Sequence, residues 1–281
     1  MHPPYRSVLA YKPYWDRRRG ASAEYTRAMI DPADSLSAFA GLRDRDYARA
    51  GLMVCEGRIV IQKALDCGVR LRSMLCVPAD EAEWLRLSAG TFSVAAMGRV
   101  EMAELLGFSF HRGTLALAER PEPPDPDGVP AGHALALWNV TDPDNLGALI
   151  RSAAALGAAR IYLGPGCADP FGRKALRASM ACALGLPVVP LSGVAELPFA
   201  RGPAGNLLAA AALVPGALEP AAIAAAGRSI TLVLGNEGWG LPADVAAACD
   251  ERVVVPMAGG VDSLNVGAAG AILMWELFRH P

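Results

Sequence analysis

The sequence predicts an α/β protein in two parts: a small α/β domain, then a larger domain with a mostly parallel sheet and helices on both faces. Three observations support this fold. Short apolar strands alternate with helical stretches along most of the chain, and a proline-rich segment at 121–130 interrupts the alternation. Near the C-terminus, two β-branched strands each run into a loop of glycines and polar residues. Parallel sheets hold ligands at such loops.

The first part divides into an arm and a domain. Residues 1–32 combine prolines, aromatic residues and the triplet Arg17–Arg19 without a clear period, which indicates an extended arm. The domain at 33–120 alternates between helix and strand, as an independent α/β unit does. Helices are expected at 35–49, 57–67, 80–88 and 99–106, and strands at 52–55, 71–77, 91–94 and 113–118.

A linker and a second domain follow. Five prolines between Pro121 and Pro130 exclude a helix or a central strand, so 121–130 is predicted to be a semi-rigid linker. The second domain, at 131–281, repeats the strand–helix alternation, which favours a parallel sheet. Its strands are expected at 134–139, 160–163, 187–189, 206–211, 230–234 and 252–255, and its helices at 146–157, 172–183 and 264–279. The alanine-rich run at 209–226 carries little information.

Composition indicates a globular protein. The chain has 281 residues, of which 53% are hydrophobic and 19% charged, with a formal net charge of −2. Six cysteines form no CxxC pair and no spacing with histidine that predicts a metal site, and Cys55, Cys67 and Cys76 are expected to be buried free thiols. No secretory leader or membrane-spanning run is visible, so a cytoplasmic protein is expected.

The two C-terminal loops carry a polar set of residues. Thr231–Leu241 and Val253–Asn265 each combine a strand end with glycines, whose backbone a ligand can approach closely. Asn236, Glu237, Ser263 and Asn265 lie within them. The alternative is structural: the glycines make turns, and Ser263 or Asn265 caps the last helix.

A third informative segment runs from Asn139 to Arg151. Asn139 ends a strand, a turn follows, and Asn145 occupies the expected N-cap of the next helix. Arg151 lies about two turns into that helix. It is either an ordinary surface residue or a planar cation that holds phosphate oxygens.

Together these segments resemble the SpoU family of RNA ribose 2'-O-methyltransferases, within the SPOUT class. The resemblance covers Asn139–Arg151, Leu234–Leu241 and Val253–Val266, and Phe171–Ser179 is similar to the family's Arg-Ala-Ser segment. It implies a C-terminal trefoil knot that binds S-adenosylmethionine, and a homodimer through the knot region. Two residues depart from the family pattern, Ala181 in place of glycine and Gly267 in place of serine or alanine. Neither removes a group that is expected to take part in chemistry.

The resemblance also implies site residues. The catalytic set is Arg151, Asn139, Asn145, Glu237, Ser263 and Asn265. The cofactor-binding set is Leu234, Gly235, Asn236, Gly238, Val255, Met257, Ser263 and Leu264, and no metal is implied. The family assigns Arg151 to activation of the 2'-hydroxyl, but a guanidinium is a poor base at neutral pH, so we favour phosphate binding and alkoxide stabilisation. Glu237 is expected to pair with an arginine or with backbone amides.

The implied partner is ribosomal or transfer RNA. Residues 51–118 are similar to the small substrate-binding domain that often precedes the catalytic one, with His111, Arg112 and, from the second domain, Arg177 as candidate RNA contacts. The last helix offers apolar residues to a dimer interface, although core packing explains them equally well.

Two other functions were weighed. A dinucleotide-dependent oxidoreductase is disfavoured because Gly164-Pro-Gly166 lacks the third glycine of that fingerprint. A relative that keeps the fold but has lost catalysis, acting in RNA binding or ribosome assembly, is the remaining alternative.

Overall fold

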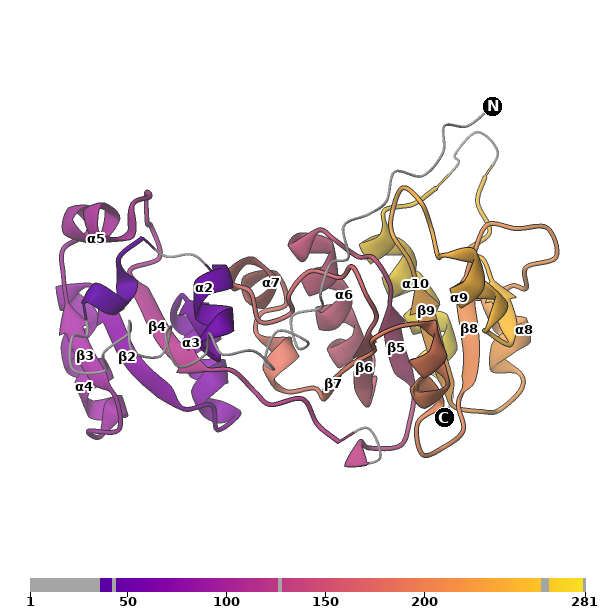
Figure 1. The fold of residues 1–281 in the computed structure, drawn as a ribbon, viewed down its shortest axis with the longest axis horizontal. Helices are drawn as coiled ribbons and strands as arrows, with labels where there is room; N and C mark the ends of the chain where they lie inside the picture. The colour runs from indigo at the N-terminus through magenta and orange to yellow at the C-terminus, as the bar shows by residue number, and fades with distance from the viewer. Residues whose placement is uncertain (1–35, 42–43, 126–127, 259–262, 280–281) are drawn as a thin grey trace.

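The computed structural model describes residues 36–41, 44–125, 128–258 and 263–279. Two sheets lie along the long axis of the molecule (Figure 1). We call the first sheet with its helices the N-terminal lobe (36–119) and the second the C-terminal lobe (134–279). The predicted α/β class is confirmed, whereas the arm at 1–32 and the loop glycines Gly259 and Gly260 lie outside the described residues. The exact domain limits stay a prediction.

The N-terminal lobe contains a four-stranded sheet in the order β1-β4-β2-β3. Its strands are β1 (Leu52–Glu56), β2 (Leu71–Cys76), β3 (Ser93–Ala96) and β4 (Thr114–Glu119). β4 is antiparallel to both β1 and β2, and β2 and β3 are parallel. The predicted helix at 35–49 is wrong in extent, because only a 3-10 turn, Ser37–Phe39, and α2 (Asp44–Arg49) are helical among the described residues.

Helices cover both faces of this sheet. Side chains of α3 (Arg58–Asp66) and α4 (Glu81–Ser88) pack in one core cluster with Cys55 and Met74. Side chains of α2 and α5 (Arg99–Leu106) pack in another with Val54 and Leu75. Neighbouring residues of one strand thus enter different clusters, as the two-residue period of a strand requires.

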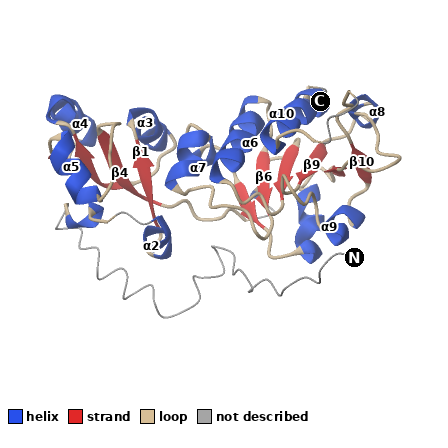
Figure 2. Ribbon diagram, turned by 90° about the horizontal axis from the view of Figure 1, so that it is seen from above, coloured by secondary structure: helices blue, strands red, loops and turns tan. Residues whose placement is uncertain are grey.

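The C-terminal lobe contains a six-stranded sheet in the order β10-β8-β9-β5-β6-β7, and every neighbouring pair is parallel. Its strands are β5 (Ala134–Leu137), β6 (Arg160–Leu163), β7 (Val188–Pro190), β8 (Leu207–Ala211), β9 (Ile230–Leu234) and β10 (Glu251–Val253). One side carries α6 (Pro143–Ala155), α7 (Arg173–Ala178), α8 (Pro220–Ala224) and α10 (Val266–Phe278), and the other carries α9 (Ala243–Ala247) (Figure 2). The predicted parallel sheet with helices on both faces is therefore confirmed.

The strand order contains a point at which the connections change direction. β5 and β9 are neighbours, but the chain leaves β5 towards β6 and leaves β9 towards β10, at the opposite edge. A crevice opens where connections diverge in this way, at the carboxyl ends of the strands. Asn139 follows the end of β5, and Gly235 follows the end of β9.

Two helix predictions need correction. The helix predicted at 172–183 ends at Ala178, because Met180 (φ 51°) and Ala181 (φ 58°) adopt the left-handed conformation before a 3-10 turn at Cys182–Leu184. The predicted N-cap at Asn145 is also wrong. Asp142 caps α6 by accepting a hydrogen bond from the Asp144 amide at 3.0 Å, since Pro143 fits the first helical position and shifts the start earlier.

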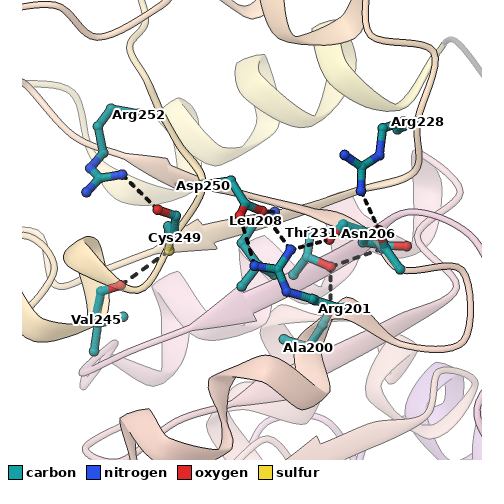
Figure 3. Close-up of polar contacts among 11 residues, drawn as sticks. Ala200, Arg201, Asn206, Leu208, Arg228, Thr231, Val245, Cys249, Asp250 and Arg252 are labelled. Carbon is teal, nitrogen blue, oxygen red and sulfur yellow. Dashed lines mark hydrogen bonds and ion pairs between the residues drawn. The ribbon is translucent and has the colours of Figure 1, made fainter.

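Polar side chains form hydrogen bonds at the amino ends of β8, β9 and β10 (Figure 3). Both carboxylate oxygens of Asp250 accept hydrogen bonds from Arg201, at 2.7 and 2.9 Å, and the Leu208 amide donates a further bond at 2.8 Å. The bond from Arg201 lowers the pKa of Asp250. Buried Thr231 donates to the carbonyl of Ala200 at 2.6 Å. Hydrogen bonds thus connect the amino ends of these three strands to the segments that precede them.

The two lobes share a continuous core. One cluster of buried apolar residues includes Cys55 and Ile61 of the N-terminal lobe together with Leu176 and Ala183 of the C-terminal lobe. Arg120, at the end of the first sheet, is almost fully buried and pairs with Asp169. No helix within the described part of the chain has the length and apolar character to cross a bilayer.

The six cysteines are free thiols, as predicted for Cys55, Cys67 and Cys76, but Cys67 is only half-buried. Burial raises the pKa of the Cys55 thiol to about 12.

Candidate functional site

A cavity of about 780 Å³ opens at the carboxyl ends of β8, β9 and β10. Its walls come from the segments after these strands, from the amino end of α10 and from α9. The lining residues are 211–214, 234–241, Ala243, Ala246, Ala247, 252–255, Met257, Ser263, Leu264, Val266, Ala269 and Leu273. Mostly apolar walls with a few polar groups are typical of small-molecule sites of this size.

The cavity gathers the residues that the sequence predicted to bind a cofactor. Leu234, Gly235, Asn236, Gly238, Val255, Met257, Ser263 and Leu264 all line it. Of the predicted catalytic set, Glu237 and Ser263 line it as well. Sequence reasoning missed Ala211–Val214, which lay in a run judged uninformative. Their position at the carboxyl end of β8 could have revealed them, because parallel strands end at a common edge.

The loop after β9 is a tight, internally bonded turn. Asn236 and Gly240 exchange backbone hydrogen bonds of 3.1 and 2.9 Å. A Cβ atom on Gly235 would lie 2.4 Å from the carbonyl carbon of Gly240, so only glycine allows the two limbs to approach. The Asn236 side chain accepts a bond from the Gly238 amide at 2.8 Å and donates to the carbonyl of Asn139 at 2.9 Å. The loop is thereby fixed to the end of β5.

A relay of side-chain hydrogen bonds joins the three predicted motifs. The amide nitrogen of Asn145, on α6, donates to Oε1 of Glu237 in the cavity wall. The amide nitrogen of Asn265 donates to Oδ1 of Asn145 at 3.0 Å. Asn265 is the N-cap of α10, where its own oxygen accepts from the amides of Gly267, at 2.9 Å, and Ala268, at 3.3 Å.

The cap fixes the direction of the relay. Backbone amides only donate, so the group of Asn265 that faces them is its oxygen and its nitrogen faces Asn145. Asn145 therefore presents oxygen to Asn265 and nitrogen to Glu237. The expectation that Glu237 pairs with an arginine or with backbone amides is wrong, since its recorded partner is a side-chain amide. Asn265 is therefore a helix cap, as the structural alternative predicted, and it also contacts Asn145; its catalytic role stays a prediction.

Asn139 has a different environment from the other predicted catalytic residues. Its backbone is left-handed, with φ 54°, and its carbonyl receives the bond from Asn236. A Cβ atom on Gly166 would lie 1.9 Å from Oδ1 of Asn139, so the side chain packs closely over that glycine. Asn139 does not line the cavity.

Arg151 also lies outside the cavity and outside the relay of hydrogen bonds. Its side chain is exposed on α6, and among the described residues it forms no hydrogen bond or ion pair and does not line the cavity. A helix turns by about 100° per residue, which separates Arg151 from Asn145 by roughly 120° around the axis of α6. A single chain thus unites Glu237, Asn145 and Asn265 but not Arg151.

The predicted RNA contacts lie between the lobes. Arg112, after the N-terminal lobe's last helix, and Arg177, on α7, both approach Oε1 of Glu56, at 3.2 and 3.5 Å. The neighbouring His111 is exposed, and Ser109 lies 3.2 Å from its Nε2. Glu56 was not predicted to have any role.

Comparison with known proteins identifies relatives of this chain. The model of the SpoU rRNA methylase family matches residues 132–275. A tRNA/rRNA methyltransferase of Mycobacterium bovis, itself uncharacterized, is 35% identical over 236 residues, which are 81% of each chain. The 23S rRNA (guanosine-2'-O-)-methyltransferase RlmB of Acinetobacter baylyi is 30% identical over 67% of this chain and 79% of its own.

A solved structure also matches. The SpoU methyltransferase AviRb of Streptomyces viridochromogenes, in complex with the cofactor AdoMet, superposes with a TM-score of 0.71 at 25% identity. The match covers 93% of this chain and 98% of AviRb.

Proposed function

The chain belongs to the SpoU rRNA methylase family, and on this premise we propose that it transfers a methyl group from S-adenosylmethionine to a ribose 2'-hydroxyl of ribosomal or transfer RNA. The observation that carries the proposal is the cavity at the ends of β8, β9 and β10, with Glu237 in its wall and the asparagine relay behind it.

The residues of the cavity suit this cofactor. Leu234, Val255 and Leu264 offer apolar surface to an adenine ring, and the backbone around Gly235 offers amide and carbonyl groups. Asn236, Glu237 and Ser263 supply polar contacts for the ribose and the amino-acid end. A volume of about 780 Å³ also leaves room for part of the acceptor nucleotide.

The residues of this chain would act by positioning and electrostatics. The bound cofactor would supply an electrophilic methyl carbon on a sulfonium. Glu237, held by Asn145, would orient the groups in the cavity, because a side chain fixed by its own hydrogen bonds holds a ligand at little entropic cost. The Arg151 guanidinium would hold the phosphate beside the target ribose and stabilise the alkoxide as it develops.

We further propose that a homodimer completes the site. Arg151 lies outside the cavity of its own chain, so a second copy is the simplest way to bring a guanidinium to it. Ile272 and Trp275 of α10 are 43% and 54% exposed, whereas Leu273, Leu277 and Phe278 of the same helix are buried. The buried residues of this helix belong to the core, and the exposed ones support the proposal that a second copy packs against it. The trefoil knot stays a prediction.

The homodimer can be tested by size and by complementation. Light scattering should give twice the mass of one chain for the wild type and the mass of one chain for a Trp275→Glu variant. Mixing Arg151→Ala chains with Glu237→Ala chains should restore part of the activity if each site draws on two copies. Two-copy particles without restored activity would show that the site lies within one chain.

The function itself can be tested in two steps. Calorimetry should detect binding of S-adenosylmethionine to the wild type, and mapping of 2'-O-methyl groups in RNA with and without the gene should find a site that depends on this protein. RNA binding without cofactor binding would favour the non-catalytic alternative instead.

A further inference from the structure

Glu56 is a buried carboxylate that three arginines surround. Its side chain, at the end of β1, is 7% exposed. Oε1 lies 3.2 Å from Nε of Arg112 and 3.5 Å from Nη1 of Arg177, and Oε2 lies 3.7 Å from Nε of Arg173. A buried carboxylate is costly unless it is paired, so this arrangement is specific and not an incidental surface contact.

The cluster joins the two lobes. Glu56 and Arg112 belong to the N-terminal lobe, whereas Arg173 and Arg177 lie on α7 of the C-terminal lobe. Arg173 is the most anchored of the three, because Asp44 accepts a bond from its backbone amide at 3.0 Å and its guanidinium lies 4.5 Å from the ring centre of Phe108. The lobes are thus coupled through one charged cluster beside their shared core.

The other two arginines keep accessible groups. Arg112 and Arg177 are 53% and 38% exposed, and both contact the same oxygen of Glu56, so their guanidinium groups lie side by side. Gly57 allows this, since a Cβ atom there would lie 3.3 Å from Cδ of Arg112, and its φ of 89° disfavours other residues. Among the described residues, the three arginines form ion pairs with two carboxylates, Glu56 and Asp44, which leaves the cluster with an excess of positive charge.

One donor of the cluster is unsatisfied. Nη1 of Arg173 is buried and has no hydrogen-bond partner among the described residues. Buried donors in native proteins are nearly always bonded, to protein, water or ligand. Paired guanidinium groups match the oxygens of a phosphodiester, which they bind at two points each.

We propose that Glu56 is a positioning residue for RNA: it gathers Arg112 from one lobe and Arg177 from the other into a single site for a backbone phosphodiester. The inference rests on the proposed function, since RNA is the substrate there. It adds a binding site that spans both lobes. α7 also packs against α6, so a strand bound at the cluster would lie along the route to the helix that carries Arg151.

The Glu56→Gln variant tests the proposal because two possible roles of Glu56 predict opposite changes in RNA affinity. If Glu56 only lowers the local positive charge, its removal strengthens RNA binding. If it positions the arginines, RNA binding weakens although a negative charge is lost. We expect about tenfold weaker binding of an unmodified 23S rRNA transcript. The slope of log affinity against log salt concentration should decrease by the amount that corresponds to the loss of about one phosphate contact.

The matched control is Glu119→Gln. Glu119 also contacts two arginines, Arg70 at 3.6 Å and Arg72 at 2.5 Å, but it lies opposite Leu52, at the other end of the β1–β4 pair. The Glu119→Gln substitution should leave the affinity for RNA unchanged. Arg112→Lys and Arg177→Lys keep both the charge and Glu56, and each should weaken RNA binding because lysine cannot form the two-point contact. These variants keep the test valid if Glu56→Gln lowers stability.

Separate readouts distinguish this inference from the proposed function. In methylation assays Glu56→Gln should raise KM for RNA and leave kcat and the Kd of S-adenosylmethionine unchanged, a pattern that a general loss of structure would not give. Equal or tighter RNA binding by Glu56→Gln, or no RNA binding by the wild type, would overturn the inference. Failure of the wild type to bind the cofactor by calorimetry would instead refute the proposed function.

Discussion

The side-chain amide of Asn145 donates a hydrogen bond to the carboxylate of Glu237, 92 residues further along the chain. This contact joins the helix after the first strand of the C-terminal sheet to the loop after its fifth. It also fixes the position of Glu237 in the cavity wall, because a side chain held by a hydrogen bond has fewer accessible orientations.

Asn145→Asp is the sharpest test of this contact. The substitution keeps the shape of the side chain but sets a second carboxylate against Glu237, and we expect a loss of about 1–3 kcal/mol in stability and a fall in methyl transfer of at least about tenfold. Thermal denaturation and single-turnover assays measure the two effects. Adding Glu237→Gln should recover most of the stability, since the bond then runs in the opposite direction. A double variant no more stable than Asn145→Asp would show that the two residues are not coupled.

Two substitutions at Asn265 separate its helix cap from its place in the relay. Asn265→Asp still caps α10 through an oxygen but loses the donor to Asn145, so its melting temperature should stay close to that of the wild type while activity falls. Asn265→Ala removes both, at a further cost of about 1 kcal/mol. Equal melting temperatures for the two variants would contradict the capping role.

Arg151→Ala should retain binding of S-adenosylmethionine, because Arg151 does not line the cavity of its own chain and, in the proposed homodimer, would contact the phosphate of the RNA and not the cofactor. Methyl transfer should fall by about 10²–10³, the range for loss of one group that stabilises transition-state charge. Arg151→Lys keeps the charge without the planar fork and should be intermediate. Calorimetry and methyl-transfer kinetics on the same preparations provide the measurements. Loss of cofactor binding in a folded Arg151→Ala protein would give Arg151 a different role.

Gly235 and Gly238 form a matched pair. A Cβ atom on Gly235 would meet the Gly240 carbonyl at 2.4 Å, whereas one on Gly238 would meet only the Asn236 side chain, at 3.5 Å. Gly235→Ala should therefore open the loop, cost about 1–3 kcal/mol and abolish cofactor binding, while Gly238→Ala should leave stability unchanged. Cofactor binding by Gly235→Ala with the affinity of the wild type would place the ligand elsewhere.

Acid should weaken the C-terminal lobe through Asp250. Its pKa is lowered chiefly by the hydrogen bond from Arg201, so the ionised form stabilises the fold above its ordinary pKa of 3.8. This stabilisation is lost as the pH falls through the lower, folded-state pKa. Denaturant titrations from neutral pH into the acid range should show a smaller acid-dependent loss of stability in Asp250→Asn. An equal loss would assign the effect to other carboxylates.

The sequence predicted the fold class and the cavity well for a simple reason. Buried strands such as β9 are continuous apolar runs, and the loops that follow them in a parallel sheet meet at one edge. Short sequence patterns gave wrong predictions where contacts between residues far apart in the sequence determine the structure. Asparagine is a residue type that favours the N-cap position, but Asp142 is the N-cap of α6 because Pro143 fits the first helical position. Neither the partner of Glu237 nor the separation of Arg151 from the cavity could be read from spacing, because both depend on how α6 lies against α10.

The central position of β9 has a further consequence. Ile230–Leu234 pairs with β5 and β8, so the ribosome delivers the middle of the C-terminal sheet only after β5, β6, β7 and β8. Until then β5 and β8 each expose an unpaired edge, and nascent chains in that condition are prone to misassociate. All strands of the N-terminal lobe, which ends at Glu119, are synthesised before β5. Synthesis therefore passes through a stage in which the C-terminal sheet lacks its middle strand, and a chaperone would be of most use to this protein at that stage.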